Sequence, residues 1–315
     1  MDFKQILYFV QVAELGSFTR AGSVLRVAQP ALSRQVRSLE VELRQPLFDR
    51  NGRGVTLTDA GQRLLAHGRG ILQQVERARQ DLEDQRGAAS GLLSIGLPPS
   101  LSRTLTSPLV DAFRERFPRA TLTVVEGLST YTLEWLAQGR VDCAVVYNAT
   151  PAAAFELLPV LDERLYLVSA RATGRALVGR PVTLAEVAAH GLVIPSRPHA
   201  IRMRLETVLA EAGLKPTVEL EIESVPAILD LVQRHPLHAV LSLNAVRASA
   251  REDAFRARPI TLAPGRAPLA TGLWIATSAQ RPRGPLLEQA VPLLAGLLAT
   301  RLAVANSSQG AVDPG

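Results

Sequence analysis

The sequence predicts an α+β multidomain protein, in which a small helical N-terminal unit precedes one long helix and a larger α/β part. Three observations lead to this fold class. Short helical patterns fill residues 6–57, an uninterrupted helical pattern follows over residues 58–87, and strand-like runs alternate with helical ones from Gly91 onward. The 315 residues are enough for two or three compact units, each of which can bury its own core.

The N-terminal unit is predicted to begin with three short helices. Ile6 and Phe9 start an apolar stripe at helical spacing, and Gly16 and Ser17 end that helix and cap the next one. Pro30 suits the start of the third helix, because its missing N–H would be unpaired there in any case. The buried face of this third helix is expected to carry Leu32, Val36, Leu39 and Leu43.

The opposite face of the third helix suits the major groove of DNA. Arginine can pair bidentately with guanine, serine can donate to a phosphate or a base, and glutamine can read adenine. The free N–H groups at a helix N-terminus also favour phosphate. We expect DNA contacts from Thr19, Arg20, Gln29, Pro30, Ser33, Arg34 and Arg37. Any one of these arginines taken alone is also consistent with a solvated surface charge, so the prediction rests on the set.

Positive charge is concentrated in the same region. The net charge of the chain is +6, and residues 17–70 contain nine arginines, no lysine and four acidic residues. A local excess of this kind favours a polyanionic partner.

Residues 9–61, FVQVAELGSFTRAGSVLRVAQPALSRQVRSLEVELRQPLFDRNGRGVTLTDAG, closely resemble the N-terminal domain of LysR-type transcription regulators. The sequence departs from the family at Arg44 and Gln45, where a glycine usually follows the leucine, and at Gly22, where alanine is usual. The resemblance implies a winged helix-turn-helix domain over residues 1–58, with the helix-turn-helix at about 18–37. It also implies double-stranded promoter DNA as a partner, with RNA polymerase as a further candidate.

The wing corresponds to a predicted hairpin. Short apolar strands flank Arg50-Asn51-Gly52-Arg53-Gly54, whose glycines permit a tight turn. We expect Arg50 and Arg53 to contact DNA, with Arg53 at the tip entering the adjacent minor groove, where the negative potential attracts arginine.

A long linker helix is predicted over residues 59–89. Its apolar positions repeat at alternating steps of four and three, which is typical of a helix that pairs with another helix. An isolated rod has no core, so we expect a homodimer. The resemblance further implies a homotetramer on interrupted inverted repeats, with recognition helices about 34 Å apart or a multiple of this. The repeating positions are Leu64, Gly68, Ile71, Val75, Ala78 and Leu82.

The alternation of strands and helices after Gly91 indicates parallel sheets flanked by helices, in two similar halves. The resemblance continues here and implies the two α/β subdomains of type 2 periplasmic binding proteins, with an effector in the cleft. We expect this domain at residues 90–303. Subdomain I comprises about 90–162 and 268–303, because the strand at 269–278 and the last helix cross back to it. Subdomain II comprises about 163–267, and residues 304–315 form a disordered tail.

Small hydroxyl residues follow several of the predicted strands. Ligands of open α/β sheets bind beyond the carboxyl ends of strands, and helix N-termini favour anions, so a small carboxylate is the expected effector. The alternative is that each hydroxyl only caps its own helix. The expected effector contacts are Ser100, Leu101, Ser102, Ser129, Thr130, Tyr147, Asn148 and Ser196.

Other classes of protein fit the sequence less well. Cys143 is the only cysteine, which excludes an intrachain disulfide, and Pro236 between His235 and His238 favours a loop over a metal site. The sequence contains no glycine-rich phosphate loop, GxSxG or HExxH, so we expect no enzyme, catalytic residue or cofactor.

The location of the protein is predicted from its apolar segments. No apolar run is long enough for a transmembrane helix, and no secretory signal precedes the basic region, so a cytoplasmic protein is expected. A solute-binding protein would share the C-terminal fold, but it would need an export signal and has no use for a basic N-terminal domain.

Overall fold

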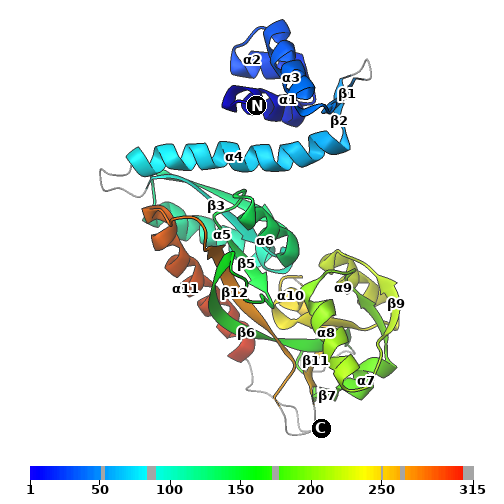
Figure 1. The fold of residues 1–315 in the computed structure, drawn as a ribbon. Helices are drawn as coiled ribbons and strands as arrows, with labels where there is room; N and C mark the ends of the chain where they lie inside the picture. The colour runs from blue at the N-terminus through cyan, green and yellow to red at the C-terminus, as the bar shows by residue number, and fades with distance from the viewer. Residues whose placement is uncertain (51–53, 84–89, 172–176, 250, 263–266, 308–315) are drawn as a thin grey trace. The chain divides into compact units, whose positions relative to one another are not determined.

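The computed structural model describes residues 1–50, 54–83, 90–171, 177–249, 251–262 and 267–307 (Figure 1). Its contacts divide the chain into two compact units, Met1–Ala88 with Gln138–Arg140, and Ala89–Ala137 with Val141–Gly315. Within the described ranges, none of the helices combines the length and the apolar character needed to cross a membrane.

The first unit contains the helices and the hairpin that the sequence predicts. Asp2 and Gln5 form a capping box at the start of its first helix, and Gly16 ends that helix in the left-handed conformation. The Ser17 hydroxyl caps the second helix by accepting from the Arg20 N–H at 3.3 Å. Pro30 lies in the first turn of the third helix, as predicted. The elements are α1 (Phe3–Leu15), α2 (Phe18–Leu25), α3 (Gln29–Leu43), β1 (Phe48–Arg50), β2 (Val55–Leu57) and α4 (Asp59–Glu83).

The core of the first unit is built around the inner face of α3. Leu32, Val36 and Leu39 are fully buried and Leu43 is partly buried against the same core, which confirms the predicted core face. The ring of Phe48 packs against Phe9 and Phe18, with centroids 5.3 and 5.7 Å away. The hairpin is also tied directly to α3, because Oε1 of Glu40 accepts from the backbone N–H groups of residues 47 and 48.

Part of α4 packs against other helices of the same chain. This corrects the prediction that a second copy of the chain covers the whole apolar seam of the helix. Leu64 packs against the core of the first unit, and a β-carbon on Gly68 would lie 2.8 Å from Cγ2 of Val10 in α1. Further along the same helix Ile71 is 36% exposed and Ala78 is exposed. Among the described side chains the seam of this helix is therefore divided: its first part packs on α1, and Ile71 and Ala78 further along are exposed.

The second unit begins with a strand and ends with a long helix. Every strand and helix predicted by the alternating pattern is present within a few residues of its expected position. The elements are β3 (Gly91–Leu97), α5 (Pro99–Arg116), β4 (Ala120–Glu126), α6 (Ser129–Ala137), β5 (Cys143–Tyr147), β6 (Phe155–Ala170), β7 (Val182–Thr183), α7 (Leu184–Ala189), β8 (Gly191–Ile194), α8 (Ala200–Glu211), β9 (Thr217–Glu221), α9 (Val225–Arg234), β10 (Ala239–Ser242), α10 (Leu243–Arg247), η2 (Glu252–Ala254), β11 (Phe255–Thr261), β12 (Ala270–Ser278) and α11 (Pro285–Ser307).

The sheets are mixed, whereas the sequence predicted parallel ones. Strands β4, β3 and β5 are parallel neighbours, but β12 pairs antiparallel with both β5 and β6, and β10 and β11 pair antiparallel with β6. The physical reason is connectivity: β12 returns from the second half to the first and therefore runs against the strands it joins. The predicted return of residues 269–278 and of the last helix to the first half is confirmed.

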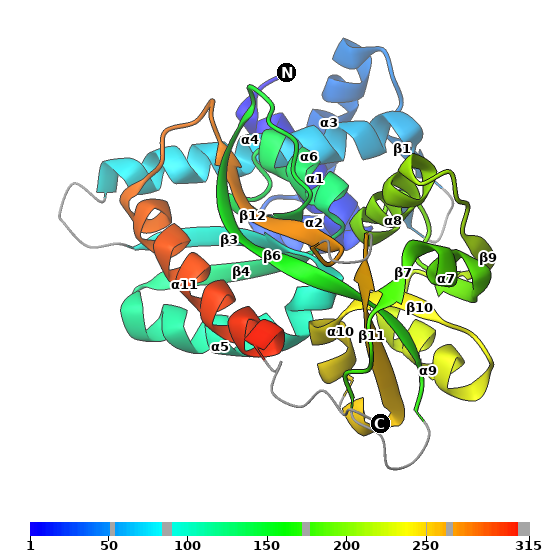
Figure 2. The ribbon, with the colours of Figure 1, turned by 90° about the horizontal axis from the view of Figure 1, so that it is seen from below.

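Strand β6 is shared by the two halves of the second unit (Figure 2). Residues 155–164 pair with β12 in the first half, and residues 165–170 pair with β10 and β11 in the second. The expected subdomain boundary at 162/163 thus falls inside one continuous strand. The boundaries expected at 58/59 and 89/90 stay predictions.

Each half of this unit has apolar layers on both faces of its sheet. Along β5, Cys143, Val145 and Tyr147 face α5 and α11, while Ala144 and Val146 face α6. The two helices α5 and α11 pack together on one face (Figure 1). In the second half the same alternation along β6 directs side chains toward α8 on one face and α9 on the other. The thiol of Cys143 is buried between these layers.

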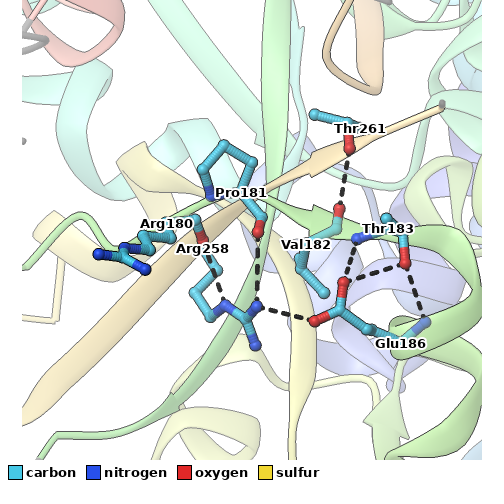
Figure 3. A network of polar contacts seen from close by, with 7 residues as sticks. All are labelled: Arg180, Pro181, Val182, Thr183, Glu186, Arg258 and Thr261. Carbon is cyan, nitrogen blue, oxygen red and sulfur yellow. Dashed lines mark hydrogen bonds and ion pairs between the residues drawn. The ribbon is translucent and has the colours of Figure 1, made fainter. Parts of the chain in front are cut away.

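The second half contains several elements that the periodicity did not predict, among them α7 and β11. Figure 3 shows how they are joined: Arg258 of β11 donates to the carbonyls of Arg180 and Pro181 and forms an ion pair with Glu186 at 3.0 Å. Thr183 and Glu186 form a capping box at the start of α7. The contacts of Arg258 join the Arg-rich, proline-containing β11 to α7, and no local pattern contains them. The capping box is a local signal, but hydrophobic periodicity does not detect it.

The end of the chain is more ordered than the sequence predicted. Helix α11 continues to Ser307, whereas a disordered tail was expected from residue 304. The run Ala303-Val304-Ala305 contains no glycine or proline and can extend the helix. Residues 308–315 of the expected tail lie outside the described residues.

Replacing Arg44 with glycine should stabilise the first unit. Arg44 ends α3 in the left-handed conformation, with φ of 52°. In this conformation a β-carbon destabilises the folded state by about 1–2 kcal/mol. Glycine removes this strain, but it also makes the unfolded chain more flexible, which reduces the gain in stability by about 0.4–1 kcal/mol. We expect Arg44→Gly to raise the free energy of unfolding by about 0.5–1 kcal/mol in a urea titration. Arg44→Ala, which keeps the β-carbon, is the control, and an equal gain from both variants would contradict this explanation.

Candidate functional site

The outer face of α3 presents a polar surface opposite the buried leucines. Gln29, Pro30, Arg34 and Arg37 are exposed, and Ser33 is half-buried. Within the described part of the chain, the guanidinium groups of Arg34 and Arg37 form no ion pair or hydrogen bond. Both groups are therefore available to a ligand from solvent.

The start of α2 lies in the same small unit. Thr19 and Arg20 are exposed, but the Arg20 guanidinium donates to the carbonyl of Leu15. This contact anchors Arg20 to the end of α1, so only part of its donor capacity remains for DNA phosphates.

The turn between α2 and α3 is unusually close-packed at Gly22. The Val27 N–H donates to the Gly22 carbonyl at 2.9 Å, and a β-carbon on Gly22 would lie only 2.8 Å from the Val27 carbonyl oxygen. Glycine at this position thus allows the backbone of the turn to approach α2 closely.

The predicted hairpin forms from β1 and β2, with Arg50 paired to Val55 across the two strands. Arg50 is the last residue of β1. Arg53, the expected tip of the wing, lies outside the described residues.

A buried polar network lies at the junction of the two halves of the second unit. Glu163, in the middle of β6, is 2% exposed and places its carboxyl group in this network. Tyr147, at the end of β5, donates to Glu163 Oε2 at 2.7 Å, and Asn244 of α10 donates to Oε1 at 3.0 Å. The Ser100 hydroxyl donates to Tyr147 Oη at 3.5 Å. Tyr147 of the first half and Asn244 of the second thus meet at one carboxyl group, and Ser100 is linked to it through Tyr147.

Burial dominates the electrostatics of this network. It raises the pKa of Glu163 above the ordinary value of a glutamate, against the opposing effect of hydrogen bonds from Tyr147, Ser242 and Asn244. Burial and the neighbouring Glu163 likewise raise the pKa of Tyr147. Both shifts favour a neutral cluster, in which the tyrosine keeps its proton.

Several of the expected effector residues have structural roles. The Ser129 hydroxyl accepts from the Tyr147 N–H at 3.0 Å. Asn148, with φ of 49°, exchanges hydrogen bonds with the backbone of Gly272 and donates to the Ala200 carbonyl at 3.5 Å. The structure therefore brings the end of β5, the start of α6, the start of α8 and Gly272 of β12 close together.

The remaining expected residues lie around this junction with different exposures. Thr130 is exposed, and Ser196, after β8, is half-buried. The half-buried Ser102 hydroxyl lies 3.4 Å from Thr106 Oγ1 on the next turn of α5. Leu101 does not fit its expected role, because its side chain is 1% exposed in the core and its N–H donates to the Pro98 carbonyl. We therefore remove Leu101 from the candidate set, because it lies on the buried face of α5 between two half-buried serines.

A cavity of about 100 Å³ opens beside this network, between α5, α9 and α10. Ser100 is the only one of the expected effector residues among its lining residues. Leu229, Ala245 and Phe255 form buried apolar walls, and Arg103, Asp230 and Arg251 are exposed charged residues at its edge.

The sequence did not identify Glu163, Asn244 or the charged residues of this cavity. Glu163 stands next to another acidic residue, Asp162, and no local pattern distinguishes the buried carboxylate from the other one. Arg103, Asp230 and Arg251 belong to separate elements, so only the folded chain brings them to one cavity.

The histidines expected in a loop lie between α9 and β10. The ring of His238 stacks on that of His190, with centroids 4.0 Å apart. Across the ranges that the structure describes, no group of three or more His, Cys, Asp or Glu side chains is arranged to hold a metal ion.

Comparison with known proteins relates both units to one family of regulators. The nitrogen assimilation regulatory protein nac of Escherichia coli (strain K12) is 36% identical over 249 residues, which cover 79% of this chain and 80% of that protein. A probable RuBisCO transcriptional regulator of Cyanophora paradoxa is 31% identical over 252 residues, covering 78% of this chain and 77% of that protein.

The fold is shared with solved structures of full-length regulators. CbnR complexed with its target DNA matches with a TM-score of 0.69 at 23% identity, over 94% of this chain and 100% of that chain. A full-length OxyR variant from Pseudomonas aeruginosa matches with a TM-score of 0.67 at 22% identity, over 95% and 94% of the two chains.

Two family models account for most of the chain. The model for the bacterial regulatory helix-turn-helix protein, lysR family, matches residues 3–62, which contain α1 to α3 and the hairpin. The model for the LysR substrate binding domain matches residues 86–299. The chain therefore belongs to the LysR family of DNA-binding transcription regulators, with a helix-turn-helix domain and a substrate-binding domain.

Proposed function

We propose that this LysR-family regulator binds promoter DNA as a homo-oligomer in the cytoplasm, and that a small carboxylate bound at the junction of its two C-terminal halves alters its state on DNA. The observation that carries the DNA-binding proposal is the division of α3 into a buried leucine face and an exposed arginine face. RNA polymerase is a candidate partner of the DNA-bound protein, and no residue is proposed to be catalytic.

The DNA contacts proposed for α3 follow from its charge and exposure. Arg34 and Arg37 are exposed, lie about one turn apart and have no partner among the described side chains. Guanidinium groups in this state can pair with guanine or with phosphate. Gln29, Pro30 and Ser33 lie at the start of the same helix, and Thr19, Arg20, Arg50 and Arg53 remain the proposed flanking contacts.

The oligomer proposed for this chain is a homodimer formed through α4. Ile71 and Ala78 expose apolar surface on the part of the helix that does not pack on α1. A second copy of the same helix would cover this seam and would supply two recognition helices for the interrupted inverted repeat. Pairing of such dimers into a tetramer is proposed as well.

The effector is proposed to act through the network around Glu163. Ser100 and Tyr147 belong to one half of the second unit, Asn244 belongs to the other, and all three are linked to one carboxyl group. A ligand bound at Ser100 can shift the equilibrium between two arrangements of the halves if it binds one arrangement more tightly. The size of the shift equals the difference between the two binding free energies. Ser102, Ser129, Thr130, Asn148 and Ser196 remain proposed effector contacts around the same junction.

Loss of the Arg34 guanidinium should weaken specific DNA binding. We expect Arg34→Ala to cost about 1–3 kcal/mol on a fragment of the chain's own upstream DNA, if Arg34 reads a base. Footprinting and salt-dependent binding titrations measure the effect. Arg63→Ala, at an exposed position of α4, is the control and should bind as the unchanged protein does. An unaltered footprint would remove Arg34 from the contacts, and no preference for any promoter fragment over random duplex would overturn the DNA-binding proposal.

A charge in the exposed part of the α4 seam should dissociate the oligomer. In the proposed dimer Ile71→Glu buries an unpaired carboxylate, at a cost on the order of 3 kcal/mol or more. Sedimentation velocity should then detect monomers at concentrations where the unchanged protein is dimeric. Gln62→Glu introduces the same charge at an exposed position of the same helix and should leave the dimer intact. Equal association of both variants would rule out this seam.

Glu163→Gln should change how stability depends on pH. Because the folded-state pKa of Glu163 is raised, its contribution to stability is full below the unfolded pKa and is lost as the pH rises through the folded value. The unchanged protein should therefore lose stability relative to Glu163→Gln in thermal melts as the pH rises above 4.5, the ordinary pKa of a glutamate. Glu211→Gln, at an exposed position of α8, is the control. Parallel pH profiles for the unchanged protein and Glu163→Gln would contradict the assigned role of burial.

A further inference from the structure

We infer that the effector is a small zwitterion, an α-amino acid with an aliphatic side chain of about four carbons, bound in the cavity between α5, α9 and α10. This inference rests on the proposed function, because it names the ligand class of the proposed effector site. Three properties of the cavity support it: its apolar walls, the charges at its edge and its position between the two halves.

The interior of the cavity suits a short aliphatic group. Leu229, Ala245 and Phe255 are at most 4% exposed and line it. An engineered apolar cavity of about 150 Å³ holds benzene, with its six carbons, so the volume of about 100 Å³ found here holds about four. A leucine or isoleucine side chain has this size.

The edge of the cavity carries charges of both signs. Arg103 comes from α5, Asp230 from α9, and Arg251 follows α10. In the ranges that the structure describes, none of these three side chains has an ion pair or a hydrogen bond. Gln233 adds a neutral polar side chain to the same lining.

This combination of charges matches a ligand that is itself charged at both ends. The guanidinium groups can bind a carboxylate, and the Asp230 carboxylate can bind a protonated amine. A simple carboxylate would use the arginines but would leave Asp230 facing a like charge, and a simple amine would leave both arginines unpaired. Only a zwitterion pairs with all three groups at once.

The position of the cavity connects it to the polar network. Pro99, Ser100 and Arg103 are contributed by α5 of the first half, while α9 and α10 belong to the second. Ser100 lines the cavity and donates to Tyr147, which donates to Glu163. A ligand that contacts both α5 and α9 therefore restrains the two halves against each other.

Calorimetric titration of the purified full-length chain tests the ligand class. L-leucine should show saturable binding. 4-Methylpentanoate lacks only the ammonium group and 3-methylbutylamine lacks only the carboxylate, and each should bind at least about fivefold more weakly, the loss expected for one partly exposed ion pair.

Substitutions of the charged residues at the cavity edge should distinguish recognition of the ligand's ammonium group from recognition of its carboxylate. Asp230→Asn should weaken the binding of leucine by about fivefold, because only leucine carries the cation, and it should not weaken the binding of 4-methylpentanoate, which is relieved of a like charge. The double variant Arg103→Gln/Arg251→Gln should weaken the binding of both ligands. If 4-methylpentanoate binds as tightly as leucine and Asp230→Asn changes neither affinity, the zwitterionic ligand is wrong.

A variant that fills the cavity tests its location. Ala248 lines the cavity at the end of α10, and Ala248→Leu should abolish leucine binding while the thermal melt remains cooperative. Ala210→Leu adds the same atoms at an exposed position of α8 and should bind leucine normally. Normal binding by Ala248→Leu would place the ligand elsewhere.

Different results would overturn the ligand class and the DNA-binding function. If neither leucine, isoleucine nor valine binds the unchanged protein while promoter DNA is bound specifically, the ligand class is overturned and the regulator remains. If promoter DNA is not preferred over random duplex, the proposed function itself is overturned, whatever leucine does.

Discussion

The C-terminal unit depends on how one buried carboxyl group is satisfied. Strand β6 runs through both halves, and it places Glu163 at their junction with 2% of its surface exposed. A buried carboxyl group without partners costs several kcal/mol, so its hydrogen bonds must be supplied by the surrounding elements. Here Tyr147 supplies one from the first half and Asn244 supplies one from the second. The hydrogen bonds to the Glu163 carboxyl group therefore depend on how the two halves are placed relative to each other.

The first unit depends on a simpler constraint, the amphipathic character of α3. Burial of Leu32, Val36 and Leu39 against α1 and the hairpin determines which face of the helix remains outside. Burial of the apolar side chains is favourable, so the arginines on the opposite face of the helix point toward solvent. Glu40, on the same helix, accepts hydrogen bonds from the backbone N–H groups of residues 47 and 48 and so holds the hairpin beside the helix.

The expected effector residues show why a hydroxyl after a strand is an ambiguous signal. Ser129 binds the Tyr147 backbone, and Ser102 lies beside Thr106 of its own helix, so both have internal partners. Ser100 combines the two roles, since it lines the cavity and is linked to the buried network. The capping alternative and the ligand alternative are therefore not exclusive, because one side chain can serve the fold and still face a ligand.

The sequence by itself determined the order of the elements, the helix-turn-helix with its polar and apolar faces, and the α/β character of the C-terminal unit. These follow from periodicity, capping residues and a nearly continuous motif, all of which are local. Only the tertiary structure decided that β6 passes through both halves, that part of the α4 seam packs on α1, and that Glu163 and not Asp162 is buried. It also brought Arg103, Asp230 and Arg251 to one cavity from three separate segments. The physical reason is that burial, charge pairing and strand direction depend on residues far apart in the chain, which no local pattern records.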